Sequence, residues 1–195
     1  MGNEAKGLAG VVAGESAIAT VGAGAGLNYR GYSIDDLAAQ ASFEEVAFLL
    51  MRGYLPTQDE LTQYTQQLIE LRTLPDALKN LLELIPKNTH PMDVLRTATS
   101  FLGTIEPEPE FASDNNFSSQ TAISDRLLAL FPGILCYWYQ YHMHQNQIDG
   151  QSDETTIGGH FLALLHGKAP TDLVRDMMNV SLILYAEHEF NASTF

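Results

Sequence analysis

The strongest constraint on the fold is a pattern that recurs from residue 42 to residue 187. A capping residue or a proline is followed by apolar residues spaced three and four apart. Ser42 and Thr57 each precede a glutamate by three residues, which is the capping-box signature of a helix start. Apolar residues at this spacing lie on one face of a helix, and that face must be buried. The pattern predicts a mainly α-helical fold, with helices over residues 42–52, 57–72, 75–85, 89–104, 121–145, 157–165 and 171–187.

Residues 8–32 differ from the rest of the chain because they are rich in glycine and alanine. Two short apolar stretches, at 10–13 and 17–21, are each followed by glycine, which favours a small β-hairpin or an irregular cap. The glycines between Gly22 and Gly26 invite comparison with a phosphate-binding loop. The Lys-Ser/Thr ending of such loops is missing, and no acidic residue follows at dinucleotide-binding spacing, so we expect a flexible turn.

Three features modify the helical pattern in the second half of the chain. Residues 106–119 begin with glutamates that alternate with prolines, which predicts an acidic loop. Pro132 lies inside 121–145 and is expected to bend or split that helix. The last helix, 171–187, is apolar almost all round, which is typical of a helix buried on every side. Only eight residues follow it, so the sequence looks cut, and we expect a longer protein to supply the elements that cover this helix.

Composition excludes several classes of function. Lys and Arg total 10 against 24 Asp and Glu, a formal net charge of −14, which disfavours binding to nucleic acid or to anionic membranes. The hydrophobic fraction of 45% is that of a globular protein with a sizeable core. No apolar run reaches the length of about 18 residues that a membrane span needs, and no signal-peptide core lies near the start. We therefore expect a cytoplasmic protein.

The single cysteine and the aromatic residues occur together. Cys136 lies in an apolar run, which predicts a small buried hydrophobe rather than a nucleophile, and one cysteine excludes a disulfide framework. Four aromatic residues follow within five positions: Tyr137, Trp138, Tyr139 and Tyr141. This run is too rich for a solvent-facing helix, so we interpret it as core together with a subunit interface.

Several strings along the chain resemble the citrate synthase family, and most closely its 2-methylcitrate synthase branch. The most specific are His-Pro-Met-Asp at 90–93 and Tyr-Ala-Glu-His-Glu-Phe-Asn-Ala-Ser-Thr-Phe at 185–195. Gly-Gly-His-Phe-Leu at 158–162 and the aromatic run at 137–139 are more similar to the 2-methylcitrate synthase branch. The resemblance extends from Gly7 to the last residue. It implies that residues 1–195 are the N-terminal part of a large, multi-helical domain with a small N-terminal β-hairpin, and that the small catalytic domain is absent. The parts would be a cap or hairpin at 1–32, helices at 33–105, the acidic loop at 106–119 and helices at 120–195.

The resemblance also implies an activity. Family members are homodimeric acyltransferases that join an acyl-CoA, either propionyl-CoA or acetyl-CoA, to oxaloacetate and then hydrolyse the thioester. The product is 2-methylcitrate, in propionate breakdown, or citrate, in the tricarboxylic acid cycle. No metal or cofactor is expected, because the coenzyme A thioester is a substrate. The alternative interpretation is a non-catalytic, shortened helical module that pairs with a full-length or complementary subunit.

The reaction needs a carboxylate base, two hydrogen-bond donors and cationic groups that hold the carboxylates of oxaloacetate. The family motifs that supply the base and the donors do not occur in this chain, so we expect no catalytic residue here. By resemblance, His188 matches the family histidine that contacts oxaloacetate, and Asn191, three residues later, is a candidate for the same pocket. Arg30 is expected to support the N-terminal cap rather than to bind an anion. The remaining histidines are expected to be structural: His90, His142, His144, His160 and His166.

Charge gives an independent check on this interpretation. Residues 101–195 contain Arg126, Lys168 and Arg175 as their only Lys or Arg residues, against 12 acidic residues. Oxaloacetate and acyl-CoA are both anions, so a site that binds them needs positive charge from elsewhere.

Overall fold

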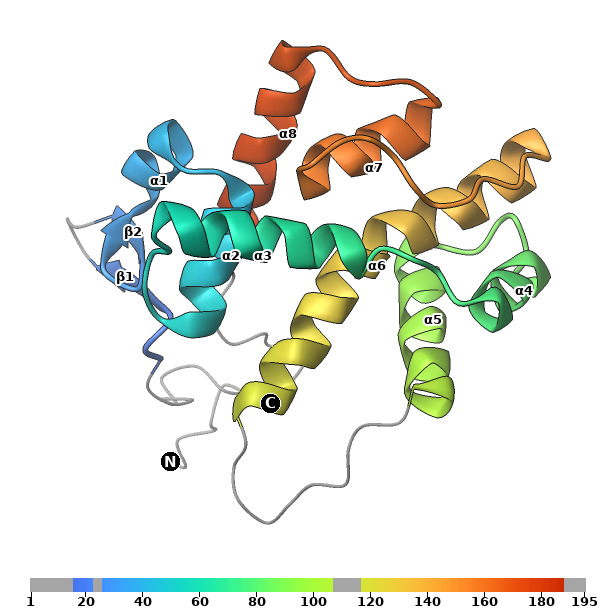
Figure 1. The fold of residues 1–195 in the computed structure, drawn as a ribbon, viewed down its shortest axis with the longest axis horizontal. Helices are drawn as coiled ribbons and strands as arrows, with labels where there is room; N and C mark the ends of the chain where they lie inside the picture. The colour runs from blue at the N-terminus through green and yellow to red at the C-terminus, as the bar shows by residue number, and fades with distance from the viewer. Residues whose placement is uncertain (1–15, 23–25, 107–116, 188–195) are drawn as a thin grey trace, which may run out of the picture.

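The computed structural model describes residues 16–22, 26–106 and 117–187. In these ranges the chain forms a three-stranded antiparallel sheet followed by eight helices (Figure 1). The strands are β1 (Ala19–Gly22), β2 (Gly26–Tyr29) and β3 (Tyr32–Ser33). The helices are α1 (Ile34–Gln40), α2 (Phe43–Arg52), α3 (Gln58–Glu70), α4 (Asp76–Leu84), α5 (Pro91–Ile105), α6 (Phe117–His144), α7 (Ile157–His166) and α8 (Asp172–Leu184). The prediction of a mainly helical fold with a small N-terminal hairpin is confirmed.

The sheet is a short meander at the edge of the helical body. Its strand order is β1-β2-β3, and Tyr29 of β2 pairs with Tyr32 of β3. The two residues between them, Arg30 and Gly31, have φ values of 51° and 89°, which is the left-handed backbone that a tight two-residue hairpin turn requires. β1 and β2 pair antiparallel, with Gly22 opposite Gly26. The residues between these two strands lie outside the described ranges. The expected apolar stretch at 10–13 lies outside the described residues.

Local sequence signals set most of the helix ends. Ser42 and Thr57 each accept a hydrogen bond from the backbone N–H three residues later, and the glutamate at that position bonds back, so both capping boxes are confirmed. Gly53 ends α2 with a φ of 93°, a conformation that glycine adopts without strain. α1, which the periodicity did not single out, is capped by Ser33.

The longest helix, α6, is the centre of the fold. It packs against α3, α4, α5 and α7, and in Figure 1 it changes direction along its length. The helix begins at Phe117, so the predicted loop to residue 119 extends too far. It also continues through Pro132 without a break, so the split that the proline suggested does not occur.

Buried apolar side chains form two separate clusters. The first joins the sheet, α2 and α3 around residues such as Tyr29, Leu49 and Leu68, and the second joins α4, α5 and α6 around Leu82 and Val94. The aromatic run of α6 belongs to the second cluster, where the indole N–H of the buried Trp138 donates to the Ile85 carbonyl. The core part of our interpretation of this run is therefore confirmed. Cys136 is also buried, as predicted, and burial raises the pKa of its thiol to about 12.

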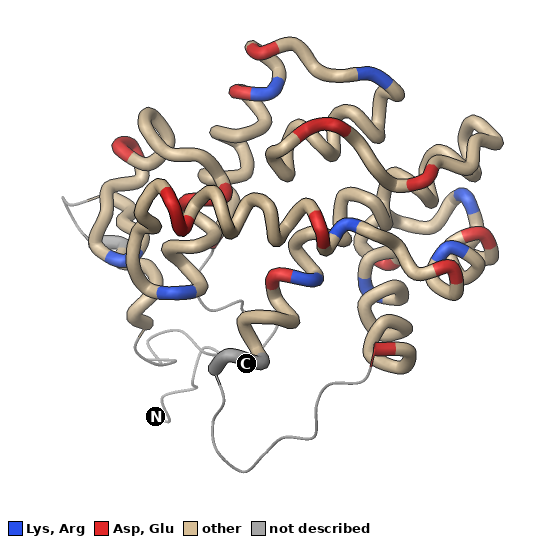
Figure 2. The backbone as a smooth tube through the Cα atoms, in the orientation of Figure 1, with Lys and Arg blue, Asp and Glu red and all other residues tan. Residues whose placement is uncertain are grey.

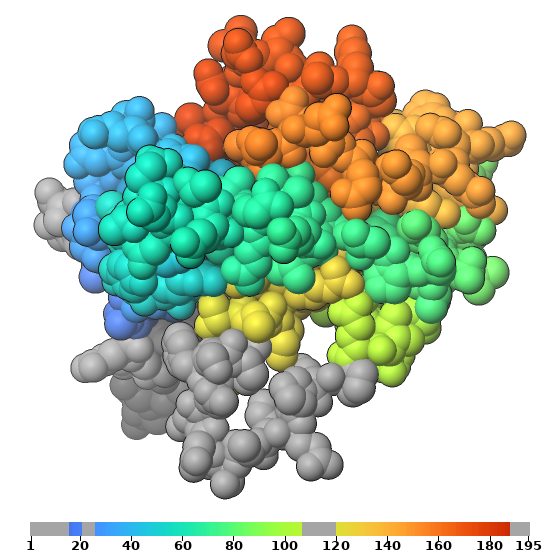
Figure 3. Space-filling model, viewed as in Figure 1, coloured from blue at the N-terminus to red at the C-terminus, as the bar shows by residue number. Residues whose placement is uncertain are grey.

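Among the described residues, three ion pairs join different segments of the fold. Arg52 of α2 bonds Asp125 of α6 at 2.7 Å, and Arg126 of α6 bonds Glu106 after α5 at 2.6 Å. Arg175 of α8 bonds Glu154, in the segment before α7, at 2.8 Å. Figure 2 shows that acidic segments outnumber basic ones along the described chain and that several of the basic segments lie beside acidic ones. In Figure 3, α3 and α4 form a band across the viewed face, in front of α6.

The last described helix is only partly covered. Of the residues of α8, only Ile183 is fully buried, while Leu173 and Met177 are 70% and 62% exposed. Within the described residues, α8 packs against α1, α2 and α7. That a longer protein covers the rest of this helix stays a prediction. None of the helices in the described ranges is long and apolar enough to cross a membrane.

Candidate functional site

α8 ends shortly before the residues that are predicted to bind oxaloacetate. A buried tyrosine fixes the end of this helix. Tyr29 of β2 is fully buried, and its hydroxyl donates to the carbonyl oxygens of Ile183 and Leu184 at 3.2 Å and 3.4 Å. The last carbonyl groups of a helix have no partner within the helix, so the tyrosine supplies one. The sheet therefore fixes the last turn of α8.

A second tie joins α8 to the turn between α1 and α2. The Asn179 side chain accepts from the backbone N–H of Phe43 at 2.7 Å, and its amide group donates to the carbonyl of Ala41 at 3.2 Å. One side chain thus satisfies a donor at the start of α2 and an acceptor at the end of α1. Together with Tyr29, Asn179 anchors the final two turns of α8 to the N-terminal part of the chain.

The two residues predicted to bind oxaloacetate, His188 and Asn191, lie outside the described residues. The structure follows the chain as far as Glu187. Their role as ligands therefore stays a prediction. The structure shows how α8, the helix that precedes them, is held by Tyr29 and Asn179. The sequence did not reveal these contacts, because they join residues more than 130 positions apart.

A second polar cluster surrounds the start of α7. Arg72 is 1% exposed, and its guanidinium donates to the carbonyls of Glu154 and Thr155. Glu44, also buried, accepts from the backbone N–H of Ile157 at 2.7 Å. Burial raises the pKa of Glu44, while the hydrogen bond from Ile157 and the charge of Arg72 oppose that rise. The cluster caps the first turn of α7 and holds the preceding segment against α3. No sequence signal marked Arg72 or Glu44.

His160 of α7 belongs to the same region and is fully buried. Its Nδ1 lies 2.8 Å from the Ser152 hydroxyl. Burial, assisted by the positive charge of Arg72, lowers the pKa of this imidazole to about 4. The ring is therefore neutral near pH 7 and offers no positive charge to an anionic substrate.

Protonation of His160 gives a testable pH dependence. The unfolded chain, with an ordinary histidine pKa near 6.5, binds a proton at higher pH than the folded chain does. Stability from this residue is therefore complete above about pH 6.5 and is lost as the pH falls toward 4. We expect the unfolding free energy of the wild type, relative to a His160→Gln variant, to fall by about 3 kcal/mol between pH 7 and pH 4.

Urea titrations across this pH range measure the difference directly. The matched control is His166→Gln, which removes an exposed histidine at the other end of the same helix and should leave the wild-type pH profile in place. Parallel pH profiles for the wild type and His160→Gln would contradict the expected role.

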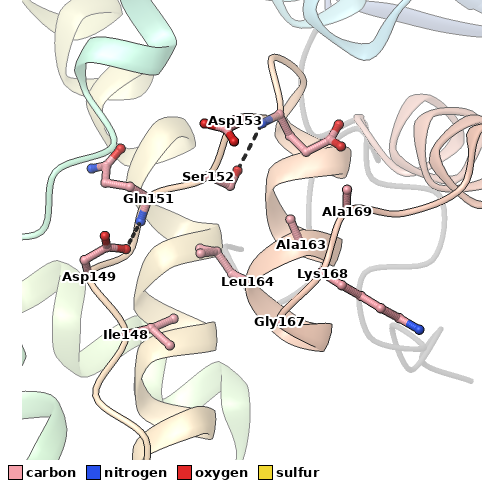
Figure 4. Close-up of a pocket in the computed structure, with 11 residues that line it drawn as sticks. Ile148, Asp149, Gln151, Ser152, Asp153, Ala163, Leu164, Gly167, Lys168 and Ala169 are labelled. Atoms are coloured by element: carbon pink, nitrogen blue, oxygen red, sulfur yellow. Dashed lines mark hydrogen bonds between the residues drawn. The ribbon is translucent and has the colours of Figure 1, made fainter.

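A pocket of about 390 Å³ lies between residues 148–154 and the C-terminal end of α7 (Figure 4). Asp149, Asp153 and Glu154 line it together with Lys168, whose side chain points away from the two aspartates in Figure 4. Three carboxylates repel a dianion such as oxaloacetate. This pocket is therefore poorly suited to the predicted substrate.

The other basic groups near the second half of the chain are already engaged. Arg175 bonds both Glu154 and Asp172, and Arg126 bonds Glu106 and the Leu71 carbonyl. The described residues thus provide no cluster of cations for two anionic substrates, in agreement with the charge balance of the sequence.

The remaining candidate residues have structural contacts. Arg30 donates to the Leu50 carbonyl at 2.8 Å, so it ties the turn between β2 and β3 to α2, in agreement with a supporting role in the N-terminal cap. His90 caps α5 by accepting from the Met92 N–H, and His142 contacts the Leu82 carbonyl. Among residues 16–22, 26–106 and 117–187, no group of three or more His, Cys, Asp or Glu side chains is placed to hold a metal ion.

Comparison with known proteins gives a consistent result. The 2-methylcitrate synthase of Shewanella oneidensis is 55% identical over 190 residues, which cover 97% of this chain and 49% of that protein. The 2-methylcitrate synthase of Mycobacterium tuberculosis is 41% identical over 97% of this chain and 47% of its own length. The citrate synthase of Deinococcus radiodurans is 36% identical, over all of this chain and 51% of its own length. The chain spans about half the length of these relatives.

Solved structures show the same relationship. The crystal structure of citrate synthase from Pyrobaculum aerophilum matches with a TM-score of 0.86 at 30% identity, over 97% of this chain and 48% of that one. The citrate synthase of Thermotoga maritima matches with a TM-score of 0.78, also at 30% identity and with the same coverage. The family model described as "Citrate synthase, C-terminal domain" matches residues 7–195. With this match over nearly its whole length, the chain belongs to the citrate synthase family.

Proposed function

We propose that this chain forms about half of an acyltransferase that condenses an acyl-CoA with oxaloacetate. The acyl-CoA is propionyl-CoA or acetyl-CoA, and the products are 2-methylcitrate or citrate and free CoA. The observation that carries the proposal is the 55% identity to a 2-methylcitrate synthase over 97% of the chain. A citrate synthase of the same fold, from Thermoplasma acidophilum, has been solved as a ternary complex with carboxymethyl coenzyme A and oxaloacetate.

In this proposal the chain contributes substrate binding rather than the chemical step. His188 donates to a carboxylate or to the keto oxygen of oxaloacetate, and Asn191 supports the same pocket. Tyr29 and Asn179 fix the helix that ends four residues before His188. The base that removes the α-proton, the donors that stabilise the enol and the cations that hold both substrates come from the rest of a family-length protein. No cofactor takes part, since the CoA thioester is itself a substrate.

The proposal includes three further features of the protein: a homodimeric state, a cytoplasmic location and a role in propionate breakdown. The partly exposed Tyr139 and Tyr141, at the end of the aromatic run, provide contact area of the kind that subunit interfaces use. The division of residues 1–195 into cap, helices, acidic loop and helices of one large domain likewise stays a prediction.

The role of His188 can be tested in a fused protein, by which we mean this chain joined to the part of the Shewanella relative outside the matched stretch. A hydrogen bond from this imidazole to a charged oxygen in a closed pocket contributes about 1.5–3 kcal/mol. His188→Ala is therefore expected to raise the KM for oxaloacetate about tenfold or more, with little change in the KM for the acyl-CoA. Asn191→Ala should have a smaller effect in the same direction. Initial rates of CoA release at varied concentrations of each substrate give both constants.

The matched control for this measurement is His166→Ala, which removes an exposed histidine of α7. A His188→Ala variant with an unchanged melting temperature and an unchanged KM for oxaloacetate would show that the assignment of His188 is wrong.

A second candidate function is a non-catalytic helical module that pairs with a complementary subunit. The exposed apolar residues of α8 favour it. It predicts assembly with a partner but no oxaloacetate-dependent release of CoA from the fused protein.

A further inference from the structure

Tyr29 has hydrogen bonds along the end of α8 that extend to the residue directly before His188. Its hydroxyl donates to the carbonyl oxygens of Ile183 and Leu184 at 3.2 Å and 3.4 Å. Burial raises the pKa of this hydroxyl, and a hydrogen bond from the Glu187 backbone opposes that rise. A phenol oxygen can share its one proton between two carbonyls and also accept from an N–H, so these contacts are compatible. One oxygen atom therefore holds both the last turn of α8 and the backbone that precedes His188.

Tyr29 is itself held firmly in the fold. Its side chain is fully buried in the first hydrophobic cluster, and its backbone pairs with Ala19 of β1 and with Tyr32 of β3. The next residue, Arg30, donates to the Leu50 carbonyl of α2 at 2.8 Å. A group that positions a binding residue must be fixed by packing and hydrogen bonds of its own. Tyr29 meets this requirement.

α8 has few other buried contacts that could fix its end. Within the described residues, Ile183 is the one member of this helix that is fully buried. Asn179 adds a second tie about one turn earlier, through its hydrogen bonds to the Phe43 N–H and the Ala41 carbonyl. The position of the helix end therefore depends strongly on the hydrogen bonds of Tyr29 and Asn179.

His188 is close enough along the chain to respond to a movement of this helix end. It follows Glu187 directly and lies four residues after Leu184, the last residue of α8. Four residues span at most about 14 Å when fully extended. A shift of about 1 Å in a group that positions a substrate can cost about a hundredfold in rate. Loosening the end of α8 should therefore impair whatever His188 binds.

We propose that Tyr29 is a positioning residue for oxaloacetate: its hydroxyl, supported by Asn179, sets the place of the backbone that carries His188. The inference rests on the proposed function, because the assignment of His188 to oxaloacetate belongs to that proposal. It deepens the proposal by giving a residue of the N-terminal sheet a part in the affinity for one of the two substrates. Tyr29 acts through His188 and does not itself contact the substrate.

The experiment introduces Tyr29→Phe into the fused protein, which keeps the ring in the core and removes only the hydroxyl. We expect the KM for oxaloacetate to rise about fivefold, with the KM for the acyl-CoA unchanged. The matched control is Tyr64→Phe, the same substitution at another buried tyrosine, whose hydroxyl donates to Asp125 at 3.0 Å. The control should lower the melting temperature and leave both KM values unchanged, because its hydrogen bond does not involve α8.

A double-mutant cycle tests whether Tyr29 acts through His188. If it does, Tyr29→Phe should raise the KM for oxaloacetate no further in a protein that already carries His188→Ala. Additive effects of the two substitutions on this KM would overturn the inference. Equal increases in Tyr29→Phe and Tyr64→Phe would also overturn it, because they would trace the effect to lost stability rather than to position.

The inference and the proposed function can fail separately. A folded Tyr29→Phe variant with an unchanged KM for oxaloacetate, when His188→Ala raises that KM, would overturn the inference and leave the proposed function in place. An unchanged KM in His188→Ala, or no oxaloacetate-dependent release of CoA by the fused protein, would refute both. Circular dichroism establishes that each variant is folded. If Tyr29→Phe is not, Asn179→Ala frees the same helix at its other tie and takes its place in the same comparisons.

Discussion

By itself, the 195-residue chain is expected to release no free CoA from propionyl-CoA or acetyl-CoA above the rate without protein, with oxaloacetate present. The described arginines of α6 and α8 are bound to carboxylates, and the buried imidazole of His160 is neutral near pH 7. The family motifs for base and donors are not among its residues. Each positioned donor of this kind contributes about 10²–10³ in rate. The fused protein should therefore be faster by at least about a thousandfold.

A thiol reagent that reports free CoA by its absorbance measures both rates under the same conditions. The fused protein is the positive control, and a sample without oxaloacetate corrects for simple thioester hydrolysis. Oxaloacetate-dependent thiol release by the chain alone would contradict the proposal that the catalytic groups come from the rest of a family-length protein.

The second large effect is expected on the free energy of unfolding when Asp125, a buried carboxylate of α6, is removed. The side chain of Asp125 is 1% exposed, accepts from Arg52 at 2.7 Å and accepts from the Tyr64 hydroxyl at 3.0 Å. The guanidinium of Arg52 also lies 4.6 Å and 4.5 Å from the ring centroids of Phe48 and Tyr64. Desolvation and the nearby charge of Asp125 raise the pKa of Tyr64, so its hydroxyl stays a donor. This network joins α2, α3 and α6.

Removing one partner of a buried pair leaves the other charge without compensation, which costs about 3–5 kcal/mol. Arg52 keeps 22% of its side chain exposed, so we expect Asp125→Ala to lower the unfolding free energy by about 3 kcal/mol. Urea unfolding followed by circular dichroism measures the change. The matched control is Asp93→Ala, which breaks the exposed pair with Arg96 and should cost less than about 1 kcal/mol. Equal losses in the two variants would show that the buried network does not stabilise the fold.

The helices whose ends depend on nearby residues could be predicted from the sequence. Ser42 with Glu45, and Thr57 with Glu60, bond within one helical turn, so the spacing alone locates each start. The end of α2 at Gly53 follows from the φ that glycine permits. Pro132 shows the limit of local reasoning, because the residue alone left open whether the helix bends or splits, and α6 continues through it.

The environment of the candidate site was harder to predict because its contacts are long-range. Tyr29 reaches α8 from a strand 154 residues earlier, and Glu44 reaches the start of α7 across 113 residues. No periodicity relates such positions. The family resemblance alone selected His188 and Asn191. The apolar residues of α8 that the sequence marks for burial are partly exposed, because no element among the described residues covers them.

The most direct test of the proposed acyl transfer is the identity of the product formed by the fused protein from oxaloacetate and propionyl-CoA. Mass spectrometry of the reaction mixture should detect 2-methylcitrate in amounts equal to the CoA released, and citrate when acetyl-CoA replaces propionyl-CoA. Release of CoA without a tricarboxylate product, or no oxaloacetate-dependent product from either thioester, would contradict it.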